Sequence, residues 1–307
     1  MEMVKAFNRR LSVAQRLPRR ISVVVAILSL AGIFFVPFHL AHPSLPLQRE
    51  PAAPVTLLPE PPPAWRDARH LVVVAGHAVY TAAGRDERTL ADEASWFLEP
   101  FQHGQLSTML SHIRRGVELA AADNASLLLF SGGETRASAG PRSEAASYWE
   151  AADASAWFGR PQVRGRAALE AQARDSFENL LFSVCRFREL SGSYPELITV
   201  VSFAFKRWRF EELHRAALRF PRSRFGFAGL DPPGLPPSVL EGEKARSAKP
   251  FERDPYGCAD AGLQQKRRER NPFRRSVSYP QGCPELAPLF AHCTPELYRG
   301  PLPWKTV

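Results

Sequence analysis

The sequence lacks the short motifs that mark several common catalytic chemistries. It contains no Gly-x-Ser-x-Gly nucleophile elbow, no Walker phosphate-binding loop and no His-Glu-x-x-His zinc helix. Ordinary serine hydrolases, P-loop nucleotidases and zinc peptidases therefore gain no support from it. Whether the chain is an enzyme is left open by its motifs.

Cysteine is scarce, with four residues in a chain of 307, and none of them forms a Cys-x-x-Cys pair. A zinc ribbon therefore gains no support, and we expect no metal site. Cys185 lies in an apolar helical stretch and is interpreted as a small core residue. Cys258, Cys283 and Cys293 allow one disulfide in an oxidising lumen, but the sequence does not select the pair.

A concentrated basic face is also missing, although the formal net charge is +9. Much of the excess comes from residues 1–20, where six Lys and Arg residues stand against Glu2 alone. The basic run 266–275 is interpreted as a solvated charged loop, which such runs usually are. Nucleic-acid binding needs basic charge gathered on one surface, so we expect no nucleic-acid partner.

Residues 21–41 hold no charged residue and have about the length needed to cross a bilayer. They separate a basic tail, 1–20, from a proline-rich linker, 42–66. The Lys and Arg excess before the span predicts a single-pass membrane protein with a cytoplasmic N-terminus. The main domain is then expected on the translocated side, either luminal or extracytoplasmic.

Three other interpretations of residues 21–41 compete with the anchor. A cleaved signal peptide requires small residues before the cut, and His39-Leu40-Ala41 fits that pattern poorly. A mitochondrial presequence fits the Arg-rich, acid-poor start, which makes the mitochondrial inner membrane the alternative location. A buried core helix is disfavoured by the flanking charge and by the linker.

Three short apolar runs, each followed by glycine or polar residues, predict buried parallel strands at 70–76, 127–133 and 197–202. Helical spacing of apolar residues predicts helices at 105–122, 143–158, 176–190 and 208–220. Shorter strands are expected near 167–169 and 224–228. This alternation predicts a doubly wound, Rossmann-like α/β fold over residues 67–230, with a mostly parallel sheet and helices on both faces. Residues 231–307 form a proline-rich extension, expected to be poor in regular structure and to cover the sheet edge or a partner surface.

Ligands of doubly wound sheets bind beyond the carboxyl ends of the strands, where the strand order reverses. The residues that follow the predicted strands are therefore candidates for a binding site. They are Gly76, His77, Ser131, Gly132, Gly133, Glu134, Ser202, Lys206 and Arg209. Glu144, Glu170, Arg174, Ser176 and Asn179 complete the candidate set.

Each candidate also has a structural interpretation. The Ser131-Gly132-Gly133 turn either presents N–H groups to an anion or is simply a tight turn. Glu144 and Glu170 are either acid–base partners or, respectively, a first-turn helix acid and a solvated strand end.

The remaining charged and polar candidates have the same ambiguity. Arg174 and Arg209 suit a carboxylate or phosphate, or else pair with Glu144 or Glu170. Asn179 is more consistent with a structural hydrogen bond, and His77 with polar filling of a loop.

An ordered set of motifs resembles a known family. After the strand ending at Gly76 come Ser131-Gly132-Gly133, a helix opening with Ser143-Glu144-Ala145, Glu170, the segment 174–179, and the segment 205–209. Over roughly residues 70–230 this order is similar to the SanA/ElyC/YdcF-like domain of unknown function, family 218. The chain departs from the pattern at Ser176, where the family usually has Thr, and at Lys206, where it usually has His.

The resemblance implies a Rossmann-type fold and an envelope or membrane setting, with no defined reaction. It suggests S-adenosylmethionine as a possible cofactor, because one relative resembles a binder of that compound. Lys206 in place of His weakens the transfer of any His-based mechanism, since Lys supplies a fixed positive charge instead.

Two functional hypotheses follow. The first is a membrane-anchored α/β protein that binds an anionic or nucleotide-like small molecule at the carboxyl ends of its strands. The second is a non-catalytic factor in envelope or membrane biogenesis that acts through a protein partner, with the extension as its contact surface.

Overall fold

Five parallel strands form the centre of the fold in the computed structural model, which describes residues 62–304. Their order across the sheet is β5-β4-β1-β6-β7. The strands are β1 (His70–Ala75), β4 (Ser126–Ser131), β5 (Ala167–Glu170), β6 (Leu197–Ser202) and β7 (Phe225–Gly229). The Rossmann-like α/β fold predicted from the apolar runs is thereby confirmed.

The central strand β1 is buried on both faces, which explains its uninterrupted apolar sequence. Leu71, Val73 and Ala75 point into one apolar cluster, and Val72 and Val74 into the other. The register places Leu71 beside Leu127 of β4 and Ile198 of β6.

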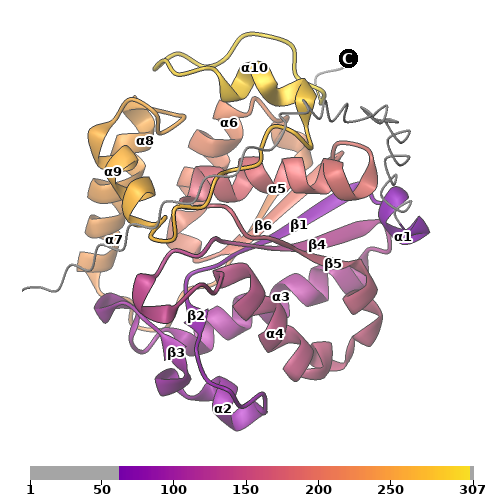
Figure 1. Cartoon of the computed structure of the whole chain (residues 1–307), viewed down its shortest axis with the longest axis vertical. Coiled ribbons are helices and arrows are strands. Elements are labelled where there is room, and N and C mark those ends of the chain that lie inside the picture. The colour runs from indigo at the N-terminus through magenta and orange to yellow at the C-terminus, as the bar shows by residue number, and fades with distance from the viewer. Residues whose placement is uncertain (1–61, 305–307) are drawn as a thin grey trace, which may run out of the picture. The chain divides into compact units, whose positions relative to one another are not determined.

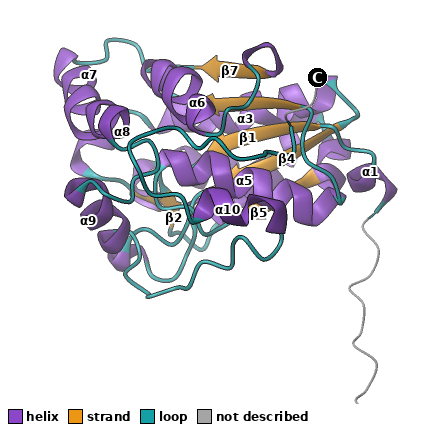
Figure 2. Cartoon of the chain, turned by 90° about the horizontal axis from the view of Figure 1, so that it is seen from above, coloured by secondary structure: helices purple, strands orange, loops and turns teal. Residues whose placement is uncertain are grey.

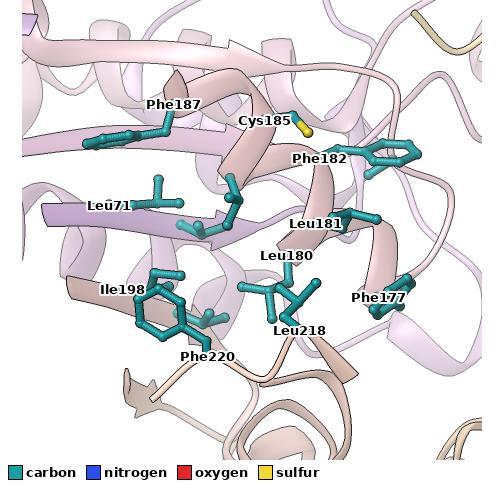
Figure 3. Close-up of a cluster of buried hydrophobic side chains, with 14 of the residues drawn as sticks. Leu71, Phe177, Leu180, Leu181, Phe182, Cys185, Phe187, Ile198, Leu218 and Phe220 are labelled. Carbon is teal, nitrogen blue, oxygen red and sulfur yellow. The ribbon is translucent and has the colours of Figure 1, made fainter. Parts of the chain in front are cut away.

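Helices cover both faces of the sheet, as Figure 1 shows. Helices α3 (Leu106–Ala122) and α4 (Glu144–Ala154) pack on the face of Val72 and Val74. The opposite face is covered by α5 (Ser176–Ser191), whose Phe177, Leu180, Leu181 and Phe187 belong to the same apolar cluster as Leu71, as Figure 3 shows. Ser143 caps α4 by accepting from the Ala146 N–H, and Asp175 caps α5 through the Glu178 N–H.

Smaller elements complete the α/β domain. A short antiparallel pair, β2 (Val79–Tyr80) and β3 (Trp96–Phe97), follows β1, with α2 (Glu87–Ala91) between its strands. Helix α1 (Pro63–Arg66) precedes β1. The predicted helix at 208–220 is shorter than expected: a π-helical segment, Arg209–His214, runs into the single turn α6 (Arg215–Ala217).

The C-terminal extension contains more regular structure than predicted. It forms α7 (Pro237–Glu243), α8 (Lys249–Arg253), α9 (Ala261–Glu269) and α10 (Ala287–Phe290). Its prolines misled the prediction because several of them, such as Pro237, Pro250 and Pro288, occupy the first turn of a helix, where no N–H is needed. In Figures 1 and 2, α7, α8 and α9 gather at the side of the sheet toward which the strands run.

The extension is part of the core rather than an appendage. Phe251, Tyr256, Leu263, Leu286 and Trp304 belong to the apolar cluster built on α5. Cys185 of α5 is a buried core residue, as predicted, but it is also bonded to Cys283, which the sequence did not indicate. Cys258 is bonded to Cys293, a pair among the three cysteines for which one disulfide was expected. The apolar stripe of α5 correctly indicated burial, but it could not indicate that the covering segment is the extension.

The predicted basic tail and membrane anchor, and most of the linker, lie outside the described residues. Between residues 62 and 304, no helix has the length and apolar character required to span a bilayer.

Candidate functional site

The strand order reverses between β1 and β6, and three predicted site residues meet at that point. His77 follows β1, and its Nε2 lies 3.1 Å from Oγ of Ser202, the last residue of β6. Lys206 Nζ lies 3.3 Å from Nδ1 of the same imidazole. Ser202 is fully buried, so its hydroxyl orients His77 rather than facing a ligand.

Burial lowers the pKa of His77 well below its ordinary value, and the neighbouring charge of Lys206 lowers it further. The imidazole is therefore neutral at physiological pH. Burial also lowers the pKa of Lys206, followed by repulsion from Arg209 and Arg270. The aromatic ring of Phe203 contacts both groups, at 4.9 Å from the His77 ring and 5.0 Å from Lys206 Nζ.

The glycine turns do not cradle an anion, because their N–H groups already have partners. Gly76 donates to Ser131 O at 2.7 Å, Gly132 to Glu170 O at 2.9 Å and Gly133 to Ala173 O at 2.7 Å. The tight-turn interpretation is therefore the one that the structure supports.

These turns instead leave room for the side chain of Glu144. A Cβ on Gly76 would lie 2.6 Å from Glu144 Cβ, and one on Gly132 would lie 2.6 Å from Glu144 Oε2. The buried carboxylate of Glu144 accepts a hydrogen bond from the Thr135 hydroxyl at 2.5 Å. Glu144 is thus fixed directly above the ends of β1 and β4.

Glu170 belongs to a separate, closed hydrogen-bond network. Its Oε2 accepts from the Ser131 hydroxyl at 2.6 Å, and its Oε1 accepts from the Gln172 N–H at 2.7 Å. Asn179 donates to the Ser131 hydroxyl at 2.9 Å, the structural role that its sequence position favoured. Burial raises the pKa of Glu170 to about 7, although the Ser131 hydrogen bond opposes the shift.

Replacing Glu170 with Gln is expected to remove a pH-dependent loss of stability. The folded state favours the protonated acid, so wild-type stability falls as pH rises from the ordinary pKa near 4.5 to about 7. Below about pH 4.5 the carboxyl group is protonated in both the folded and the unfolded state, so its raised pKa does not change the free energy of unfolding. We expect Glu170→Gln to match the wild type at pH 4 and to be more stable at pH 8 in urea unfolding. Equal pH profiles for the two proteins would contradict this role.

Four other candidates take part in ion pairs or hydrogen bonds that stabilise the fold. Arg174 pairs with Glu178 at 2.6 Å and Arg209 with Glu243 at 2.9 Å, so the partners expected from the sequence, Glu144 and Glu170, were wrong. The Ser176 hydroxyl lies 2.8 Å from His214 Nε2, and Glu134 pairs with Arg275 at 2.8 Å.

Beside this strand edge lies a cavity of about 450 Å³. Three segments form its walls: the chain after β3, the loop between β4 and α4, and helix α9 of the extension. Its lining residues are Phe97, Glu99, Phe101, Thr135, Arg136, Ala137, Ser138, Lys266, Glu269 and Arg270. Thr135, which lines the cavity, donates a hydrogen bond from its hydroxyl to Glu144. The charges of Arg270 and Lys266, which also line the cavity, lower the pKa of Lys206.

The basic run 266–275 was interpreted as a solvated loop, but its first part, up to Glu269, belongs to helix α9, and two of the run's cations, Lys266 and Arg270, line the cavity. Arg268, Arg274 and Arg275 are exposed, as expected. Lys266 and Arg270 are half-buried. This basic run was the only sign of the cavity in the sequence. It lies far along the chain from every strand end that indicated a binding site.

Three half-buried cations near the strand ends have no carboxylate partner in the described part of the chain. Lys206 contacts His77, Lys266 Nζ lies 3.3 Å from Ser247 Oγ, and Arg270 donates to Arg174 O at 3.0 Å. Burial, reinforced by repulsion from Arg270 and Arg209, lowers the pKa of Lys266 to about 7. Arg136 is different, because Glu99 lies 3.1 Å from its guanidinium.

This arrangement can hold an anion in the cavity, at the end of α9. Guanidinium and ammonium groups recognise phosphate and carboxylate, and partial burial strengthens the attraction. Among residues 62–304, no group of three or more His, Cys, Asp or Glu side chains is placed to hold a metal ion.

Comparison with known proteins finds one informative similarity. No protein-family model and no solved structure matches the chain. The chain is similar to the uncharacterized protein YOR238W of Saccharomyces cerevisiae, with 25% identity over 263 residues that cover 69% of this chain and 86% of the yeast protein.

Proposed function

We propose that the protein binds an anionic small molecule in the 450 Å³ cavity beside the carboxyl ends of β1 and β4. The observation that carries this proposal is the pair of cations that line the cavity without a carboxylate partner among residues 62–304, Lys266 and Arg270. Lys206, behind them, also lacks such a partner there. Buried charges in proteins are normally paired, because an unpaired charge loses hydration without compensation. A bound anion would supply the missing partner.

The surrounding charges support an anion rather than a cation. Burial, and after it repulsion from Arg209 and Arg270, lowers the pKa of Lys206 and of Lys266. Arg209 is buried, and its Nε has no hydrogen-bond partner among the described residues. Such a cluster destabilises the unliganded fold, and an anion would relieve the repulsion.

S-adenosylmethionine, which the family resemblance suggests, suits this cluster poorly. Its sulfonium and ammonium groups outweigh its one carboxylate, so it carries a net positive charge at neutral pH. A phosphate-bearing ligand matches the cavity better on charge alone.

Thermal unfolding with inorganic pyrophosphate as the probe tests the proposal. We expect pyrophosphate to raise the unfolding temperature of the wild-type protein, with a smaller effect at high salt because exposed charges are screened. S-adenosylmethionine at equal concentration is the control and should produce no shift. The proposal fails if millimolar pyrophosphate leaves the unfolding temperature unchanged while the protein is folded.

We further propose that the domain matures in an oxidising compartment, on the translocated side of a membrane. All four cysteines take part in disulfides, which are rare in reducing compartments. The charge-free segment 21–41, preceded by basic residues, supports the same topology. Protease protection of sealed membranes should leave the domain intact, and digestion without detergent would contradict the proposal.

A further inference from the structure

The cavity has two chemically different walls. Lys266 and Arg270, at the end of α9, form a cationic wall, and Phe97 and Phe101, in and after β3, form an aromatic wall. An inorganic anion would use the cationic wall alone. The aromatic wall therefore needs a separate explanation.

Phe101 lies on that wall, and 61% of its surface is exposed. The exposed ring at the cavity offers apolar area that a flat ligand ring would remove from water. Phe97 lies on the same wall and is half-buried.

The segment that carries Phe101 is held in place. The turn Pro100–Gln102 is closed by Gln102, whose Oε1 accepts from the Glu99 N–H at 2.8 Å. The Nε2 of the same side chain donates to His77 O at 2.8 Å, and Gln102 is itself buried. Phe101 is thus presented from a backbone anchored to the residue that follows β1.

We propose, building on the anion site of the preceding subsection, that the ligand is a phosphate ester with an aromatic ring, of the size of a mononucleotide. Its phosphate binds Lys266 and Arg270, and its ring stacks on Phe101. Aromatic side chains bind the flat face of a nucleobase through stacking and apolar burial. A volume of about 450 Å³ lies in the range of small-molecule sites.

Three polar residues of the lining suit the linking group of such a ligand. Ser138 offers a hydroxyl, and Glu99 and Glu269 offer carboxylates that accept hydrogen bonds from sugar hydroxyls. The carboxylates also make a ligand with anionic charge at both ends unfavourable. The cavity therefore favours one anionic end and one neutral aromatic end.

Calorimetric titration with adenosine 5′-monophosphate and ribose 5-phosphate tests the inference, because adenine in the first compound replaces only the anomeric hydroxyl of the second. We expect the nucleotide to bind about tenfold more tightly, the order of magnitude of one stacked base. Phe101→Ala should remove that difference and leave the affinity for ribose 5-phosphate unchanged. Trp208→Ala, which truncates an exposed aromatic residue outside the cavity, is the matched control and should change neither affinity.

The outcomes separate the inference from the function on which it rests. Equal affinities for the two compounds, with pyrophosphate still bound, would overturn the aromatic ligand alone. Absence of binding by all three compounds would overturn the anion site itself. Because Phe101 is exposed, the variant is expected to keep the wild-type unfolding temperature, which verifies that any loss is local.

Discussion

Replacing Lys266 with Met and Arg270 with Gln in the same protein should reduce pyrophosphate affinity by at least a hundredfold. Each cation is expected to contribute about 1.5–3 kcal/mol through a charged hydrogen bond, so each substitution alone should lower affinity by roughly ten- to a hundredfold. Calorimetric titration measures the change. Lys249→Met with Arg268→Gln is the matched control, because it removes the same charge from exposed positions of the extension.

In the absence of ligand, Lys266→Met should increase the stability of the protein, although it weakens pyrophosphate binding. The pKa of Lys266 is about 7 in the folded protein, and its ordinary value is higher, so the unfolded chain binds more protons between about pH 7 and pH 10. The free energy of unfolding of the wild type therefore rises with pH in that window. Lys266→Met removes this pH dependence, so the unliganded variant should be more stable than the wild type below about pH 7.

For the double variant, pyrophosphate affinity within threefold of the wild-type value would contradict the role of Lys266 and Arg270.

Replacing Arg267 with Gln should be among the most destabilising single substitutions in the extension. Its guanidinium lies 2.6 Å from Asp175 and 3.2 Å from Glu178, whose side chains are 1% and 4% exposed. Removing one partner of a buried ion pair leaves uncompensated charge and lowers the free energy of unfolding by about 3–5 kcal/mol. Arg268→Gln, on the exposed side of the same helix, is expected to change it by less than about 0.5 kcal/mol.

The effect of Arg267→Gln should depend on pH in a defined direction. Burial alone would raise the pKa of Asp175, but the charge and hydrogen bond of Arg267 hold it well below its ordinary value. This stabilisation is fully present above the ordinary pKa and is lost as pH falls toward the depressed one. Urea unfolding should therefore show a larger difference between wild type and variant at pH 7 than at pH 3. Equal losses for Arg267→Gln and Arg268→Gln would contradict the structural role of this pair.

The role of α9 also affects how the two functional hypotheses can be separated. A chain ending at Leu230 would lose Lys266 and Arg270 together with any partner surface, so its failure would not distinguish ligand binding from a protein contact. Lys266→Met retains the extension and removes only a cation. Loss of function in cells with this variant, together with rescue by Lys249→Met, would favour ligand binding.

The sheet could be predicted from the sequence because its strands are short and apolar on both faces. Leu197–Ser202 was predicted without error in either boundary, and the other strands to within a residue or two. The meeting of His77, Ser202 and Lys206 also followed from the sequence, since the carboxyl ends of parallel strands share one edge.

The cavity could not be predicted in the same way, because its cationic wall is set by tertiary contacts. The position of α9 depends on the pairing of Arg267 with Asp175, 92 residues away, and on the apolar contacts of Leu263. Neither interaction leaves a periodic signal. The sequence also could not decide whether the glycine turns bind an anion or are simply tight turns. The reason for glycine at 76 and 132 is the side chain of Glu144, which packs against both positions only in the folded protein.

The ionisation of Lys266 itself tests the anion site most directly. Nuclear magnetic resonance of protein labelled in its lysine side chains reports the pKa of Lys266, whose signal is assigned by its absence in Lys266→Met. The anion site predicts a pKa of about 7 without ligand and a clear increase toward the ordinary value of about 10.4 when pyrophosphate saturates the protein. A pKa that is already ordinary without ligand, or one that pyrophosphate leaves unchanged, would contradict it.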